Sequence, residues 1–418
     1  MAGVAGRRKL IFGAAAAAAG AAGIAAWRLW PEQGIWNPCL AQLPRRLAEH
    51  ELVRSAWAGL DPLKVWDAHA HLIGAGDSPS GVYVNPRLES LASPQHYARR
   101  VFFLNAGCAH DPPGNVDRAY VARLRNLLDA MPRGVKLLLF AFERTHRADG
   151  SPDLERTSFH VPDAYARDTA RSAPDRFEWV ASIHPYRADA VEALEAAARD
   201  GARAVKWLPN AMDIDPASPR CDRFYAALAR LGLPLVSHAG LERAVPGGEQ
   251  ALGNPLRLRR ALEAGVRVVV AHCSSMGQDR DLDRGADGPL VDSFDLFARL
   301  MDEPRYLGRL FGDLSAMTQI NRAAPALARV IERSDWHPRL LNGSDYPLPG
   351  VMPLFSLEYL VQLGLLDPAA IPALGEIRRH NPLLFDFVLK RQLRAGGRAL
   401  AASVFETRPF FDRGLRGD

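Results

Sequence analysis

From Lys64 onward, short apolar runs rich in Val, Ile and Leu alternate with segments whose apolar residues recur at a helical period. This alternation is typical of strand–helix units around a parallel sheet. Eight runs have the length and composition of buried strands, namely 64–69, 135–141, 178–183, 203–208, 233–238, 266–271, 308–314 and 339–344. The pattern therefore predicts an α/β fold of the (β/α)8 barrel type.

Helices are predicted between most of these strands. Gly201, Gly232 and Gly265 each follow a run of helical period, where a helix commonly ends. The predicted helices cover 188–199, 221–231, 255–264, 293–302 and 323–332. The expected alternation of strand and helix therefore holds over most of the barrel.

The first connection departs from this alternation, because 72–134 is too long for one crossover. We interpret it as a loop rich in Gly and Pro, a helix from Ser93-Pro94 to about Gly107, and a second helix over 116–130. The apolar run 101–104 has an alternative interpretation as a strand, which would give nine strands and shift the register at the start of the barrel. We expect an extended first connection in either case.

The amino-terminal segment has the layout of an export signal. Basic residues at 7–9 precede an uncharged, Ala-rich run over 10–26, and the twin arginines resemble a twin-arginine translocation signal. The alternatives are a buried helix, or a membrane anchor with Trp27, Trp30 and Trp36 at the interface. We expect an exported protein, in the periplasm or tethered to the membrane by this segment alone. The predicted order is a signal or anchor over 1–31, a lead-in over 32–63, the barrel over 64–395 and a tail over 396–418.

Composition and charge narrow the range of functions. Of the 418 residues, 48% are hydrophobic and 24% are charged, which excludes a disordered, collagen-like or coiled-coil chain. The formal charge is +5, but Arg7, Arg8 and Lys9 contribute three of these charges, and the remaining balance of +2 argues against a nucleic-acid partner. The four cysteines have no CxxC spacing, so neither a disulfide scaffold nor a thiolate zinc site is expected, and any bridge would be incidental.

Candidate chemistry begins at the first predicted strand. The sequence Asp67-Ala68-His69-Ala70-His71 places two histidines at alternate positions, so their side chains are expected to point the same way. An isolated pair of this kind is also compatible with hydrogen-bonded core residues. Two imidazoles that converge on one point are, however, suited to bind a metal ion.

Four further polar residues stand at the ends of otherwise apolar predicted strands. They are, in chain order, Lys206 on the fourth strand, His238 on the fifth, His272 on the sixth and Asp345 on the eighth. The spacings between successive members match one, one and two strand–helix repeats of about 30 residues each. We expect them at equivalent heights, at the carboxyl end where such barrels place their sites. The pattern predicts one cluster that also contains the two histidines.

This ordered set, with HxH on strand one, Lys on four, His on five and six, and Asp on eight, resembles the amidohydrolase superfamily. The resemblance is to the branch of amidohydrolase-related TIM-barrel metal-dependent hydrolases and covers roughly 64–390, where Asn381-Pro382 is similar to the start of that branch's closing helix. It implies that His69, His71 and Asp345 hold one divalent metal ion. Imidazole and carboxylate ligands make zinc the expected ion.

The resemblance leaves one or two metal ions open. In members with two ions, the lysine of strand four, here Lys206, is carboxylated and bridges to a second ion. The histidines of strands five and six, here His238 and His272, hold that ion. In members with one ion, His238 completes the first site, and His272 contacts the substrate or the attacking water. A protonated lysine beside a dication is disfavoured, so we expect Lys206 to be neutral, carboxylated or turned toward an anionic substrate group.

The resemblance implies hydrolysis of a small molecule by metal-activated water, at an amide, lactone, ester or related bond. Asp345 would act as general base and then as general acid. One alternative is metal-dependent, non-oxidative decarboxylation of an aromatic or unsaturated acid, because the same branch resembles such lyases. An alternative of another class is a non-catalytic barrel that keeps only a ligand-binding pocket, although polar groups are costly to keep in an apolar barrel without use.

Four more residues are weaker candidates for substrate contact. His184 ends the third predicted strand, and a structural hydrogen bond is the alternative for it. Trp207, Asn210 and Tyr346 follow the site residues closely and are expected to line the cleft. Three histidines on loops are expected to be solvated, namely His110, His146 and His160.

Overall fold

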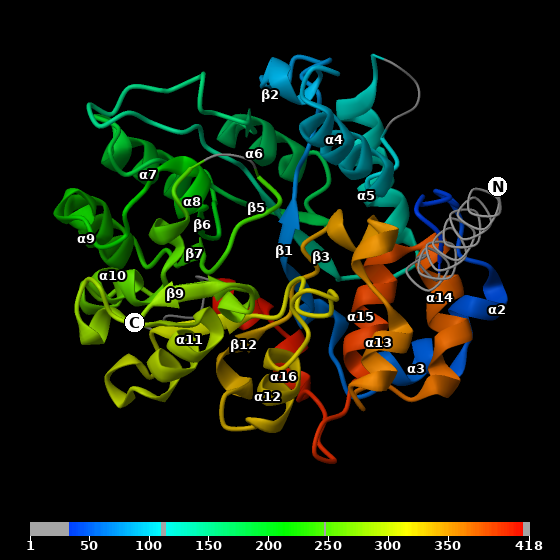
Figure 1. Cartoon of the computed structure of the whole chain (residues 1–418). Helices are drawn as coiled ribbons and strands as arrows, with labels where there is room; N and C mark the ends of the chain where they lie inside the picture. The colour runs from blue at the N-terminus through cyan, green and yellow to red at the C-terminus, as the bar shows by residue number, and fades with distance from the viewer. Residues whose placement is uncertain (1–32, 110–113, 246–247, 413–418) are drawn as a thin grey trace, which may run out of the picture.

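The structure is a closed barrel of eight parallel strands surrounded by helices (Figure 1). The computed structural model describes residues 33–109, 114–245 and 248–412. The barrel strands are β1 (Trp66–His71), β3 (Lys136–Phe140), β5 (Phe177–Val180), β6 (Val205–Trp207), β7 (Leu235–His238), β8 (Val268–Ala271), β11 (Leu310–Asp313) and β12 (Leu340–Leu341). They correspond one to one to the eight predicted strands, so the predicted barrel is confirmed.

Two isolated pairings close the barrel. Strands β1, β3 and β5 form one parallel sheet, and β6, β7, β8, β11 and β12 form a second. Ala181 pairs with Val205 between the two sheets, and Ala70 pairs with Tyr346 beyond β12. His71 N also donates to Tyr346 O over 2.8 Å. The last strand thus returns to the first, which brings the carboxyl ends of all eight strands to one rim.

Helices cover the outside of the strands (Figure 1). The longer ones are α4 (Pro94–Ala106), α5 (Val116–Asp129), α6 (Asp163–Arg171), α7 (Ala190–Arg199), α9 (Asp222–Leu231), α10 (Arg259–Glu263), α11 (Ser293–Asp302), α12 (Ala326–Glu332), α13 (Leu357–Gln362), α14 (Ile371–His380) and α15 (Pro382–Gln392). They include all seven predicted helices. The run 101–104 lies inside α4, so the alternative with nine strands is wrong. Helix α6 was not predicted, because its apolar stripe is thin and its buried residues are Ala166, Thr169 and Ala170.

Apolar side chains fill the barrel and its amino end. One buried cluster consists of Trp66, Ala68, Leu138, Phe140, Val180, Ala204, Val236, Val269, Leu341 and Phe411. Phe411 belongs to α17 (Arg408–Phe411), which follows α16 (Ala402–Phe405) near the end of the chain. Thr407, between these helices, donates a hydrogen bond from Oγ1 to the carbonyl of Trp66. The predicted tail therefore packs against the amino end of the barrel, opposite the rim where polar side chains gather.

The first connection contains one short strand that was not predicted. Strand β2 (Tyr83–Val84) pairs in antiparallel fashion with β4 (Phe159–His160), a strand from the connection after β3. Val84 and Phe159 are neighbours in this pairing and both line the main pocket. The small sheet thus joins two connections at the wall of the pocket.

Asp117 of α5 orders the loop that follows β1. Its Oδ1 accepts hydrogen bonds from Ala75 N and Gly76 N at 2.7 and 3.1 Å, and its Oδ2 accepts from Ser78 Oγ and Ser80 Oγ at 2.7 and 2.5 Å. Burial raises the pKa of Asp117, but these donors outweigh it and hold that pKa below its usual value. An ionised carboxylate with four donors is a strong local anchor.

The lead-in segment packs against the outer helices. It forms α2 (Arg45–Ala48) and α3 (Glu51–Trp57), and Trp57 stacks on Phe387 of α15 with the ring centroids 4.1 Å apart. Within the part of the chain that the structure describes, no helix is long and apolar enough to cross a membrane. The predicted export signal or anchor over 1–31 lies outside that part.

A disulfide bond joins the lead-in to the first connection. It links Cys39 to Cys108, two residues beyond α4. Beside it, Asn37 N donates to Asn105 Oδ1 over 2.8 Å, and Asn105 Nδ2 donates to Asn37 O over 3.1 Å. The bridge was expected to be incidental, but with these bonds it fixes the lead-in to the end of α4.

A buried ion pair lies beneath the site, between α15 and the segment after β12. Lys390 Nζ is 2.7 Å from Asp386 Oδ2 and donates to Gly343 O over 2.7 Å. Both side chains are buried. Burial raises the pKa of Asp386 to about 7, even with Lys390 beside it. The lysine therefore both compensates a buried carboxylate and holds the backbone that leads to the predicted metal ligand Asp345.

Replacement of Lys390 by methionine is expected to lower the free energy of unfolding by about 3 kcal/mol at pH 8, because a buried carboxylate would lose its partner. Urea denaturation monitored by circular dichroism measures the change. The double variant Lys390→Met with Asp386→Leu is the matched control, since it removes both charges and should recover most of the loss. Equal stability of Lys390→Met and the unaltered protein would contradict this account.

Candidate metal centre

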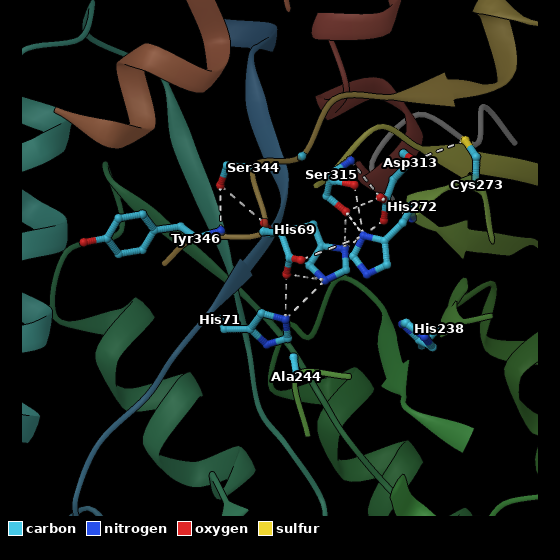
Figure 2. Close-up of polar contacts among 12 residues, drawn as sticks. His69, His71, His238, Ala244, His272, Cys273, Asp313, Ser315, Ser344 and Tyr346 are labelled. Carbon is cyan, nitrogen blue, oxygen red and sulfur yellow. Dashed lines mark hydrogen bonds and ion pairs between the residues drawn. The ribbon is translucent and has the colours of Figure 1, made fainter. Parts of the chain in front are cut away.

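Three ligand atoms converge at the carboxyl rim of the barrel, and Figure 2 shows the two histidines among them. His71 Nε2 lies 3.0 Å from Asp345 Oδ1, and His69 Nε2 lies 3.4 Å from the same oxygen. The two Nε2 atoms are 3.3 Å apart. The structure thus brings together the three residues that the resemblance assigns to the first metal ion.

These distances fit a divalent ion. With metal–ligand bonds of about 2.0 to 2.1 Å in a tetrahedral site, neighbouring ligand atoms stand about 3.3 Å apart. Burial, aided by the charge of Lys206, lowers the pKa of His69 to about 4, so its imidazole is neutral at neutral pH, as a metal ligand must be. Burial raises the pKa of Asp345, but the contacts with His272, His69 and His71 outweigh it and hold that pKa well below its usual range. Two imidazoles and a carboxylate suit zinc or another divalent transition metal ion.

The backbone after β12 is shaped to deliver Asp345. A Cβ at Gly343 would stand 2.6 Å from His69 Cβ, so glycine permits this segment to lie against β1. Asp345 N donates to His69 O over 2.7 Å, and the φ of Asp345 is +60°. A left-handed φ is unfavourable for a residue other than glycine, and such strain is concentrated at functional sites. Here it turns the carboxylate toward the two histidines.

Asp313, the last residue of β11, supports His69 from behind. Its Oδ2 lies 2.8 Å from His69 Nδ1, and its Oδ1 accepts hydrogen bonds from His272 N and Ser315 N at 2.9 and 3.0 Å. A proton on His69 Nδ1 leaves the Nε2 lone pair for the ion. Asp313 is not among the residues predicted from the sequence, although the rule that polar strand ends form the site identifies it when applied to the seventh strand.

Replacement of Asp313 by asparagine is expected to weaken zinc binding by about 10- to 100-fold. If the asparagine carbonyl keeps the bonds to His272 N and Ser315 N, its amide group faces His69 Nδ1 and favours the tautomer that protonates Nε2. Chelator competition measures the dissociation constant. Asp279→Asn is a matched control, because Asp279 is also buried but accepts from Ser293 Oγ, outside the pocket. Unchanged zinc affinity in Asp313→Asn would contradict the supporting role.

The other three predicted members of the cluster lie at the same rim. Lys206 Nζ is 3.4 Å from His69 Nε2, and burial lowers the pKa of Lys206 to about 8. His272 Nδ1 is 3.9 Å from Asp345 Oδ2, and the ring of His238 lies 5.3 Å from that of His272. His238 stands apart from the three converging atoms (Figure 2). All six predicted residues line one pocket, and the number of ions they hold stays a prediction.

A sharp turn carries His272 into this pocket. Strand β8 ends at Ala271, and His272, Cys273 and Ser274 follow with φ values of 55°, 48° and 53°. His272 Nδ1 lies 2.8 Å from Ser315 Oγ. Cys273 points away from the site, toward the backbone carbonyl of Asp313 (Figure 2). The turn therefore separates two adjacent side chains, and the thiol does not join the metal site.

The pocket above the centre has a cavity volume of about 1110 Å³, its open mouth included. Its apolar wall consists of Ile73, Val84, Leu88, Phe103, Leu104, Phe142, Phe159, Leu208, Val245, Pro347 and Leu348. Four charged residues that were not predicted also line it, namely Arg99 and Arg100 of α4, Glu242 after β7 and Arg322 after β11. Burial raises the pKa of Glu242, and its Oε2 lies 3.4 Å from His238 Nε2. A concave, mostly apolar pocket with a few polar groups is typical of a small-molecule site.

Two of the predicted substrate contacts lie outside this pocket. His184 is buried, and its Nε2 is 2.9 Å from Met212 O, which is the structural hydrogen bond given as its alternative. Trp207 donates from Nε1 to Ile183 O over 2.8 Å and stacks on Phe224. Trp207 follows Lys206 directly on β6, so the alternation of a strand turns it away from the site.

The other two predicted contacts also belong to the surrounding structure. Asn210 donates from Nδ2 to Gly240 O over 3.2 Å and does not line the pocket. Tyr346 points away from the metal centre in Figure 2, and its ring lies 5.9 Å from that of Tyr120. Residues next to a site residue in the sequence are thus poor candidates, because the backbone directs neighbouring side chains apart.

Two of the loop histidines are buried, so their predicted solvation is wrong. His146 Nε2 and His160 Nδ1 each lie 3.7 Å from Glu143 Oε1, and Arg187 Nη1 donates to Glu143 Oε2 over 2.6 Å. These four residues do not line the pocket. His110 lies outside the described residues.

A family model matches most of the described barrel. The family model described as Amidohydrolase matches residues 66–375, which span every barrel strand and all six predicted site residues. No curated protein matches the chain. The family match therefore covers both the fold and the metal centre.

Among solved structures, the chain is similar to a probable 2-pyrone-4,6-dicarboxylic acid hydrolase from Acinetobacter baumannii, with 14% identity, 78% of this chain and 99% of that chain covered, and a TM-score of 0.41. It is also similar to 5-carboxyvanillate decarboxylase from Sphingomonas paucimobilis, with 13% identity and a TM-score of 0.41. The match covers 76% of this chain and 98% of that chain. A third similar structure is that of 2,6-dihydroxybenzoate decarboxylase from Rhizobium, with 14% identity and a TM-score of 0.37. The match covers 77% of this chain and 97% of that chain.

Proposed function

We propose that this chain, which belongs to the amidohydrolase family, hydrolyses an amide, lactone, ester or related bond in a small molecule. It would do so with one or two bound divalent metal ions, and zinc is the expected ion. The observation that carries the proposal is the convergence of His69 Nε2, His71 Nε2 and Asp345 Oδ1 within 3.0 to 3.4 Å of one another. They lie at the floor of a concave, mostly apolar pocket of the kind that binds small molecules.

A bound divalent ion would lower the pKa of a water toward about 7 and polarise the oxygen of the scissile bond. Asp345 is ionised, because its pKa is held well below the usual range. Its Oδ1 belongs to the three converging atoms, whereas Oδ2 accepts the proton of the attacking water and passes it to the leaving group. His272 is held at Nδ1 by Ser315, which leaves Nε2 for the substrate or for a second ion.

Lys206 takes one of two states in this proposal. Burial lowers its pKa to about 8, and a dication nearby would disfavour the ammonium form further. A neutral amine can be carboxylated and bridge two ions, or it can bind the substrate beside a single ion. Activation of the purified enzyme by bicarbonate would support the carboxylated form.

The test is metal quantification of the purified protein, followed by assays with lactones, amides, esters and aromatic acids. We expect one or two ions per chain, hydrolysis of at least one class, loss of activity with a chelator and recovery with zinc. A protein that binds no metal, and that hydrolyses nothing with zinc added, would contradict the proposal.

The same panel separates two alternatives. Release of carbon dioxide from an aromatic or unsaturated acid, without uptake of water, would instead support a decarboxylase. The stacked Phe142 and Phe159 rings, with centroids 4.2 Å apart in the pocket wall, suit such planar substrates. Ligand binding without turnover under any metal would support a non-catalytic barrel.

We also propose that the protein is exported, to the periplasm or to the outer face of the membrane. The Cys39–Cys108 disulfide supports this proposal, because disulfides persist in oxidising compartments. Cell fractionation tests it, with Arg7→Lys and Arg8→Lys as a pair of substitutions that keep the charge but remove the twin arginines. Full export of the lysine variant would contradict the twin-arginine route, and a cytoplasmic location of the unaltered protein would contradict export itself.

A further inference from the structure

The pocket contains a buried arginine whose role is not yet assigned. Arg322, on the segment after β11, lines the pocket together with His69 and Asp345 and is only 6% exposed. Its Nη1 has no hydrogen-bond partner among the described residues. A guanidinium stays charged even though burial lowers its pKa. A buried N–H group without a hydrogen-bond partner is costly, and a ligand that accepts its hydrogen bond would remove that cost.

The other cations of the pocket differ from Arg322. Arg99 lies at the pocket wall and is partly exposed to solvent. Arg100 lies at the pocket wall with 23% of its side chain exposed, and its Nη2 is 2.9 Å from Glu89 Oε1. Lys206 Nζ lies at the metal centre, 3.4 Å from His69 Nε2. Among the cations that line the pocket in the described part of the chain, Arg322 is therefore the buried one with an N–H group that has no hydrogen-bond partner.

Three carboxylates lie near Arg322 without satisfying its hydrogen bonds. Glu242, Asp345 and Asp313 attract its charge, but none of them accepts a hydrogen bond from Nη1. A carboxylate of the ligand can accept the hydrogen bonds that these three groups do not.

We propose that Arg322 binds a carboxylate at an end of the substrate that does not react, so that the substrate is a small organic acid with an apolar body. This inference rests on the proposed function, because it takes the pocket as the substrate site. The planar fork of a guanidinium matches a carboxylate in two parallel hydrogen bonds. The stacked rings of Phe142 and Phe159, with Phe103, provide a wall for a flat apolar body.

Attachment at two points would orient the substrate. The carboxylate is held by Arg322, and the scissile bond is placed at the floor formed by His69, His71 and Asp345. Such a two-point hold fixes the reacting atoms before the chemical step and excludes other orientations. It also selects acids over neutral compounds of the same shape, because a neutral compound leaves the guanidinium unpaired.

The experiment compares benzoate with benzamide, two ligands of the same shape that differ in charge. Isothermal titration calorimetry is carried out on zinc-loaded protein. We expect benzoate to bind about tenfold or more tightly than benzamide, and Arg322→Met to weaken benzoate by about tenfold or more. In Arg322→Met the affinity for benzamide should change by less than about twofold, because the neutral amide gains little from the charge of the guanidinium. Arg322→Lys should give an intermediate benzoate affinity, because it keeps the charge without the fork.

The matched control is Arg100→Met, which removes a cation of the same pocket that is already paired with Glu89. It should keep the preference for benzoate. Thermal unfolding and zinc content are measured for every variant, and Arg322→Lys provides the comparison if Arg322→Met does not fold. An unchanged preference in Arg322→Met would overturn the proposal, because the zinc ion would then hold the carboxylate. An equal loss in Arg100→Met would also overturn it, by showing a general effect of charge.

Failure of this inference can be told apart from failure of the proposed function. If no compound of the panel is hydrolysed but the preference for benzoate depends on Arg322, the proposed function fails and the carboxylate site stands. If esters are hydrolysed with the same kcat/KM whether or not they carry a distal carboxylate, the carboxylate site fails and the hydrolase stands.

Discussion

Replacement of His69 and His71 together by alanine is expected to remove the metal ion and to lower hydrolysis by about 1000-fold or more, because the water would no longer be activated. The two histidines supply two of the three converging ligand atoms, and Asp345 alone would remain. Elemental analysis of the purified variant measures the metal content, and the substrate found with the panel measures the rate.

A second pair of histidines serves as the matched control for this variant. His146 and His184 are buried, their rings are 4.5 Å apart, and neither lines the pocket. Their double replacement by alanine removes the same two groups from the interior, so it should cost stability but leave the metal bound. Full occupancy in the His69 and His71 variant would show that the ligands have been assigned wrongly.

Replacement of Asp345 by asparagine should keep the fold and reduce kcat by about 100-fold or more. The amide has nearly the same shape as the carboxylate, but it cannot accept the proton of the attacking water at Oδ2. The rate is measured with zinc at saturation, so that weaker metal binding does not contribute. A pH profile checks the assignment further, since the limb that reports the general base should disappear.

Asp279→Asn is the matched control for this prediction, because it neutralises a buried aspartate outside the pocket. Its kcat should stay within about twofold of the unaltered protein, as is usual for a change away from the reacting atoms. An unchanged kcat for Asp345→Asn, with zinc bound, would remove Asp345 from the path of the proton.

The barrel could be predicted from the sequence because its strands are buried on both faces. Such strands appear as nearly continuous apolar runs, and Val268 to Ala271 of β8 is an example. Against that background, a polar residue at a strand end is conspicuous, as with Lys206 and His238. The same contrast located all six residues that line the pocket floor.

The remainder of the site depends on contacts that no local pattern records. Arg322 and Glu242 belong to loops whose side chains have no period to reveal their direction. Cys39 and Cys108 are 69 residues apart and meet only in the folded chain. Asp313 is the exception, since the strand-end rule identifies it. It ends the seventh strand, which carries none of the residues that the resemblance uses.

Five apolar wall residues, from Ile73 to Leu104, come from the single connection between β1 and β3, whereas the converging ligand atoms come from β1 and the segment after β12. Asp117 and the Cys39–Cys108 disulfide hold that connection in place. The described part of 72–134 therefore shapes one side of the pocket and supplies none of the converging ligand atoms. Selectivity and reactivity could then diverge separately during evolution, with new substrates acquired while the catalytic floor is preserved.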